Sequence, residues 1–64
     1  MNDGSVHVLL ADDDAMVRRG LTLLLDGVDG IEVVAEASDG DEVPTQVARH
    51  RPDVVLMDLR MHRV

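Results

Sequence analysis

Three short apolar runs divide the chain, and each is rich in the branched residues that favour strands. The runs lie at about residues 6–11, 31–37 and 53–58. A short apolar run bounded by polar or turn residues predicts a buried strand. The middle run alternates in part between apolar and acidic residues, which is typical of a strand at the edge of a sheet. We therefore expect three strands, with the middle one of the sequence at an edge.

Helical periodicity fills the first interval, at about residues 15–27. Asp14 precedes this segment and is placed to accept hydrogen bonds from its first turn as an N-cap. Arg18 and Arg19 fall away from the apolar stripe of the helix, so we expect both side chains in solvent. The stripe itself follows the spacing of one helical face and consists of Val17, Leu21, Leu24, Leu25 and Val28.

The second interval predicts a shorter helix over about residues 41–50. Asp39 and Glu42 have the spacing of a capping box. If the helix begins at Asp39, however, Pro44 removes one of its early hydrogen bonds. A start near Pro44 avoids this loss, because proline is well tolerated in the first turn. The sequence leaves both starts open.

The predicted order of strand, helix, strand, helix, strand is typical of a parallel sheet with right-handed crossover connections. The chain has 64 residues, no cysteine and no aromatic residue. It can therefore build one small domain with a marginal aliphatic core, without disulfides or thiolate metal sites.

Charge and hydropathy exclude some classes of partner. The formal net charge is -7, and such a chain repels the phosphates of nucleic acids. No apolar run reaches the roughly 20 residues of a membrane span. The first residues also lack the positive charge of a secretory signal. We expect no binding of nucleic acid by this segment, no membrane association and a cytoplasmic location.

Three acidic residues follow predicted strands. Asp12 and Asp13 come after the first strand, and Asp58 ends the third. Parallel strands end at one edge of the sheet, which is where open α/β sheets bind ligands. If the first and third strands are neighbours, the three carboxylates converge, and a hard divalent cation such as Mg²⁺ relieves their repulsion. A carboxylate beside Mg²⁺ is also a competent nucleophile for phosphoryl transfer.

A plainer interpretation of the first two acids is also available. Asp12 and Asp13 could be only a strand end beside a helix cap, since Asp commonly begins helices. The presence of Asp58 at the end of another strand favours the metal site.

Three segments resemble the receiver domains of response regulators. Residues 8–14 are similar to that family's first strand and acidic pair, residues 37–42 to its second strand-to-helix turn, and residues 51–61 to its phosphoacceptor strand. The resemblance implies a flavodoxin-like (CheY-like) α/β fold, reduced here to β-α-β-α-β with strand order 2-1-3. Residues 1–64 would then be a partial receiver domain, similar to receivers that precede helix-turn-helix output domains.

The resemblance also implies roles for individual residues. Asp58 would accept a phosphoryl group from the phosphohistidine of a sensor histidine kinase. Asp13 would bind Mg²⁺ directly, and Asp12 directly or through water. Asp58 and the backbone carbonyl of Arg60 would complete the protein ligands of the metal. Such a domain is a regulatory phosphoacceptor and not an enzyme.

The chain departs from the family pattern in its last residues and its length. The family has proline after the methionine that corresponds to Met61, where this chain has His62. A complete receiver is longer, and its hydroxyl residue after the fourth strand and its lysine after the fifth have no counterpart here. We therefore expect impaired switching and a bare apolar edge on the third strand, which invites pairing with a second receiver.

Two other functions stay open at this point. An inert or interfering fragment would keep the receiver-like sequence and pair only with an intact receiver or kinase. A phosphohydrolase with an aspartate nucleophile would need a second acid at the position of Arg60. A calcium-binding loop is disfavoured, because its acids alternate along the chain and do not sit side by side.

Overall fold

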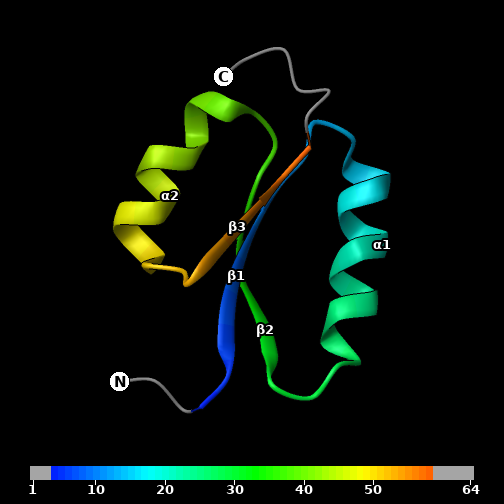
Figure 1. The fold of residues 1–64 in the computed structure, drawn as a ribbon. Helices are drawn as coiled ribbons and strands as arrows, with labels where there is room; N and C mark the ends of the chain where they lie inside the picture. Colours follow the sequence, from blue (N-terminus) through cyan, green and yellow to red (C-terminus); the bar gives the residue numbers. More distant parts are fainter. Residues whose placement is uncertain (1–3, 59–64) are drawn as a thin grey trace.

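The computed structural model describes residues 4–58 of the chain. Its elements occur in the order that the sequence predicts (Figure 1). They are β1 (Val6–Ala11), α1 (Ala15–Asp26), β2 (Ile31–Ala37), the 3₁₀ turn η1 (Gly40–Glu42), α2 (Val43–His50) and β3 (Val54–Met57).

Within residues 4–58, the three strands form a parallel sheet in the order β2-β1-β3. This order confirms the prediction, with β2 at an edge. β1 lies in the middle and pairs with a strand on each side. Figure 1 shows α1 and α2 on opposite sides of the sheet. Because both of its edges are paired and both of its faces are covered, β1 is the strand most removed from solvent, as its continuous apolar sequence predicts.

The hydrophobic core is built around β1. Leu9 and Leu10, at the centre of this strand, are 0% and 1% exposed. Leu9 packs in a cluster with the small side chains of Ala35 and Ala37 on β2, and Val43 of α2 closes over it. Since alanine supplies little apolar area and aromatic residues are absent, this core is small.

The ends of α1 follow the capping chemistry of the sequence. Asp14 is the N-cap, as predicted, and its Oδ1 accepts hydrogen bonds from the amides of Met16 at 2.9 Å and Val17 at 3.2 Å. The helix ends at Asp26, one residue earlier than expected, and Gly27 is its C-cap. Within the described residues, neither α1 nor α2 has the length and apolar character that crossing a bilayer requires.

The segment that leads into α2 differs in detail from the expectation. Asp39 caps the 3₁₀ turn η1, and α2 begins at Val43 instead of residue 41. Pro44 therefore lies in the first turn, where its missing N–H has no helical partner to lose. Glu42 does not close the predicted capping box with Asp39. Its carboxylate accepts hydrogen bonds from the hydroxyl of Ser38 at 2.7 Å and from the amide of the same residue at 3.3 Å.

The third strand is shorter and more exposed than the other two. It spans Val54–Met57, where the sequence predicted residues 53–58. Asp53 fastens its start to β1, since the Asp53 amide donates to the carbonyl of His7 at 2.7 Å and the His7 amide donates to Asp53 Oδ2 at 2.8 Å. The helices contact mainly β1 and β2, so the four side chains of β3 are 37–44% exposed. In the part of the chain that the structure describes, its outer edge pairs with no strand.

Candidate functional site

The register of the sheet brings the acidic residues to one edge. Ala11, the last residue of β1, pairs with Met57, the last residue of β3. Asp12 and Asp58 therefore each follow a paired position and emerge side by side at the carboxyl ends of their strands. Asp13 is the next residue along the chain. The convergence that the sequence predicts for neighbouring strands is thus present in the fold.

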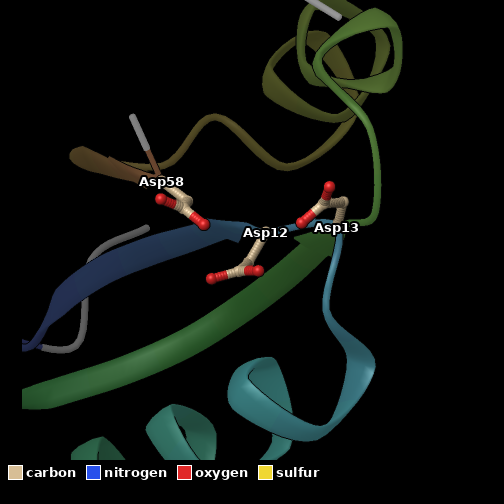
Figure 2. Close-up of side chains that lie close together, drawn as sticks. All are labelled: Asp12, Asp13 and Asp58. Atoms are coloured by element: carbon tan, nitrogen blue, oxygen red, sulfur yellow. The ribbon is translucent and has the colours of Figure 1, made fainter. Parts of the chain in front are cut away.

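The three carboxylates form a compact cluster (Figure 2). One oxygen from each of Asp12, Asp13 and Asp58 lies within 4.8 Å of the others. Asp12 is 5% exposed, whereas Asp58 is half-buried and Asp13 exposed. Three negative charges at this range repel one another, and a cation between them would relieve the repulsion.

The cluster has donor chemistry and dimensions that suit Mg²⁺. Carboxylate oxygens are the hard ligands that this ion prefers, and it usually keeps several waters. Two oxygens bound to one ion at 2.0–2.1 Å are at most about 4.2 Å apart. Of three such oxygens only one pair can be opposite, and adjacent ligands lie about 2.9 Å apart, so acids within 4.8 Å of one another approach by up to about 2 Å or bind in part through water. The residues present therefore fit the ion.

Backbone hydrogen bonds hold the acids at the edge. The Asp12 amide donates to the carbonyl of Ala37 at the end of β2, and the Asp58 amide donates to the carbonyl of Ala11, both at 3.0 Å. The side chain of Asp12 is held as well, because its Oδ1 accepts from the amide of Asp14 at 2.8 Å. Asp12 is thus tied to its surroundings through both its backbone and its carboxylate, as a buried polar group requires.

A hollow of about 230 Å³ opens beside two of the acids. This volume exceeds what a single water molecule occupies, so a larger group can approach Asp58 through it. The wall is mostly apolar, and α1 contributes to it. The hollow is lined by Leu10, Ala11, Asp12, Leu21, Leu56, Met57 and Asp58.

Of the residues that the sequence singled out for the site, the structure brings Asp12, Asp13 and Asp58 together. Asp53 lies at the amino end of β3, at the edge of the sheet opposite the cluster. Arg60, whose carbonyl was expected near the metal, lies outside the described residues.

Arg18 was not predicted as part of the site, and the expectation that its side chain is exposed to solvent was wrong. The Arg18 side chain is only 17% exposed, and its Nη1 donates to the backbone oxygen of Asp12 at 2.6 Å. Leu24, expected on the buried face, is instead 70% exposed. The half-buried residues of α1 include Arg18, Thr22 and Leu25, which share one helical face. The available signal was position, since Arg18 lies one helical turn after the N-cap and so near the strand ends.

Comparison with known proteins gives consistent matches. The family model described as response regulator receiver domain matches residues 8–64. The oxygen regulatory protein NreC of Staphylococcus haemolyticus is 46% identical over 56 residues, which are 88% of this chain and 26% of that protein. The response regulator GacA of Pseudomonas viridiflava is 43% identical over the same length and coverage. A protein-glutamate methylesterase/protein-glutamine glutaminase of Geobacter metallireducens is 52% identical over 59 residues, 92% of this chain and 17% of that protein.

A solved structure agrees with these relatives. The response regulator domain of Thermotoga maritima CheB superposes with a TM-score of 0.86 at 33% identity, covering 94% of this chain and 45% of that chain. The chain spans about a quarter of the length of NreC and GacA. The enzymatic name of the Geobacter relative describes a protein of which this chain matches only 17%.

Proposed function

Because the chain belongs to the family of response regulator receiver domains, which act in phosphorelay signalling, we propose that Asp58 accepts a phosphoryl group from a histidine kinase. Asp12, Asp13 and Asp58 would hold the Mg²⁺ on which the transfer depends. The backbone carbonyl of Arg60 is included in the proposed ligand set. The observation that carries the proposal is the convergence of three carboxylates within 4.8 Å at the carboxyl edge of the sheet.

The chain's own residues supply position and access. The amide of Asp58 is fixed to β1, which sets its carboxylate beside the hollow. Asp58 is half-buried and lines this hollow, through which an incoming phosphoryl group can approach it. When bound, Mg²⁺ would offset negative charge on the transferring group. Asp12 and Asp13 contribute oxygens that hold the ion next to Asp58.

The proposed transfer balances without a further reagent. A carboxylate oxygen of Asp58 attacks the phosphorus of the kinase's phosphohistidine, and an oxygen–phosphorus bond forms. The nitrogen–phosphorus bond breaks, and its electron pair stays on the imidazole nitrogen, which takes up a proton. The product on this chain is an acyl phosphate at Asp58.

The partner of this reaction is a sensor histidine kinase, which we place with the chain in the cytoplasm. The proposal treats residues 1–64 as the first part of a receiver fold, supported by the 45% of the CheB domain that they match. We also propose that β3 pairs with a second receiver. The 37–44% exposure of its residues supports this. The phosphohydrolase and the inert fragment are not favoured, because the family model matched is that of a receiver domain.

Intact mass measurement tests the phosphoacceptor directly. The folded chain, checked by circular dichroism, is incubated with Mg²⁺ and a small phosphodonor such as acetyl phosphate. We expect the added mass of one phosphoryl group on the wild type and none on Asp58→Asn. Asp53→Asn is the matched control, since it makes the same change at the other end of the same strand.

Two results would contradict the proposal. One is a folded wild-type chain that gains no phosphoryl group from the donor in the presence of Mg²⁺. The other is an adduct that persists in Asp58→Asn, which would place the acceptor elsewhere. Sustained release of phosphate from unrelated phosphomonoesters would favour the hydrolase.

A further inference from the structure

A single arginine connects the acidic cluster to two elements of the fold. Arg18 of α1 donates from Nη1 to the backbone oxygen of Asp12 at 2.6 Å and from Nε to Oε1 of Glu36 at 2.9 Å. Its side chain is 17% exposed, whereas that of Glu36 on β2 is 44% exposed. Two hydrogen bonds from one planar guanidinium fix its orientation, because its donors are held in a rigid fork.

The carbonyl that Arg18 contacts belongs to the peptide group between two of the proposed metal ligands. A peptide group is planar, so the direction of the Asp12 carbonyl sets the direction of the Asp13 amide. Two backbone dihedrals, ψ of Asp12 and φ of Asp13, then set how the Cα–Cβ bonds of the two acids are oriented relative to each other. A hydrogen bond that holds the Asp12 carbonyl therefore restricts the geometry of the acid pair.

Electrostatics alone would disfavour an arginine at this place. A positive charge near a divalent-cation site opposes binding of the ion through Coulomb repulsion. Glu36 offsets part of that charge in the ion pair with Arg18. Arg18 therefore favours metal binding only if its hydrogen bond to the Asp12 carbonyl stabilises the bound state by more than its Coulomb repulsion of the ion destabilises it.

We propose that Arg18 is a positioning residue, which orients the Asp12–Asp13 peptide group for metal binding while Glu36 holds the guanidinium in place. The inference rests on the proposed Mg²⁺ site and names the residue outside the carboxylate cluster that sets its geometry. Arg18 touches neither the ion nor the phosphoryl group. It acts through the backbone oxygen of Asp12.

The neighbouring arginine provides a matched control. Arg19 is exposed, carries the same charge and lies on the same turn of α1. Within residues 4–58 its side chain forms no hydrogen bond or ion pair. Arg18→Gln and Arg19→Gln therefore remove the same charge, but only the first removes the contact with the Asp12 carbonyl.

Magnesium titration of the full chain by calorimetry separates the hydrogen bond of Arg18 from its charge. Loss of the hydrogen bond should lower the Mg²⁺ affinity, whereas loss of the charge alone should leave it equal or raise it. Loss of a supporting partner outside the ligand set typically weakens metal affinity by about tenfold or more, and we expect roughly that loss for Arg18→Gln. We expect Arg19→Gln to bind as tightly as the wild type or slightly more tightly. Equal or tighter binding by Arg18→Gln would mean that the arginine acts only as a charge, and would overturn the inference.

Carbonyl-carbon NMR of the metal-free chain supplies a readout that a general loss of stability would not give. The Asp12 carbonyl resonance should move in Arg18→Gln and stay in Arg19→Gln, with both variants still folded by circular dichroism. Glu36→Gln, which keeps an acceptor for Arg18 Nε, should shift this resonance less than Glu36→Ala. An Asp12 carbonyl resonance unchanged in Arg18→Gln would refute the contact itself.

The wild-type titration distinguishes failure of this inference from failure of the proposed function. A folded wild type that binds no Mg²⁺ would remove the metal site, and with it the role of Arg18. If the wild type binds Mg²⁺ and the two arginine variants bind it alike, the metal site stands and only the inference about Arg18 falls.

Discussion

Replacing Asp13 with asparagine should change stability in opposite directions without and with Mg²⁺. The Asp13 side chain is exposed and forms no hydrogen bond within residues 4–58, so the substitution mainly removes a charge. That charge faces two other carboxylates within 4.8 Å. Coulomb's law gives about 1 kcal/mol for each such pair in water and about 3 kcal/mol at an effective dielectric constant of about 20.

For exposed Asp13 the lower value applies to each of the two pairs, and screening by salt at about 0.15 M reduces their sum roughly by half. Without metal, we expect Asp13→Asn to be more stable than the wild type by about 1 kcal/mol. With Mg²⁺ at a hundred times its dissociation constant, the wild type gains about 2.7 kcal/mol. A variant that has lost this ligand and binds Mg²⁺ tenfold or more weakly gains about 1.4 kcal/mol or less, so the order of the two stabilities reverses.

Urea unfolding followed by circular dichroism measures the free energy of unfolding of each protein, without Mg²⁺ and at saturating Mg²⁺. The matched control is Asp29→Asn, since Asp29 is an exposed acid in the turn between α1 and β2, at the opposite edge of the sheet. We expect this control to follow the wild type in both conditions. Either of two results would refute this expectation: Asp13→Asn is no more stable than Asp29→Asn without metal, or its gain in stability from Mg²⁺ equals that of the wild type.

The same unfolding assay checks three further expectations. Leu9→Ala removes a fully buried side chain and should lower the free energy of unfolding by about 3 kcal/mol or more. Leu23→Ala, at a site 68% exposed, should lower it by less than about 0.5 kcal/mol. Equal losses would contradict the burial of β1. Asp14→Ala removes the acceptor for two amides of α1 and should cost about 1 kcal/mol; no loss would contradict the cap. Gly20→Ala inside α1 has open space for the methyl group and should raise the free energy of unfolding by up to about 1 kcal/mol. Gly30→Ala, at φ +87°, should lower it by about 1 kcal/mol. A change of the same sign in both variants would contradict these backbone conformations.

The acidic cluster could be predicted because it depends on features that are local in sequence. Asp12 and Asp58 each follow an apolar run that predicts a buried strand. In a parallel sheet, such positions share one edge. The remaining requirement is that the two strands be neighbours, and the resemblance to receivers supplied the order 2-1-3. The pairing of Ala11 with Met57 then brings the acids together.

The role of Arg18 could not be predicted from periodicity. A helical repeat groups the residues that share a face, but the docking of α1 on β1 and β2 decides which face meets the sheet. That docking turned Arg18 and Thr22 inward and left Leu24 70% exposed. An arginine can enter such a contact because its stem packs against apolar surface while its guanidinium meets polar groups. Here those polar groups are a strand-end carbonyl and Glu36.

The sequence by itself determined the order of the elements, the cap of α1 and the acids that end β1 and β3. Each of these follows from hydrogen-bonding groups and apolar spacing within a few residues of chain. Only the tertiary structure decided the approach of the three carboxylates to within 4.8 Å, the burial of Arg18 and the exposure of β3. These features depend on the relative placement of elements distant in the chain, which is set by packing across the whole sheet and not by any local pattern.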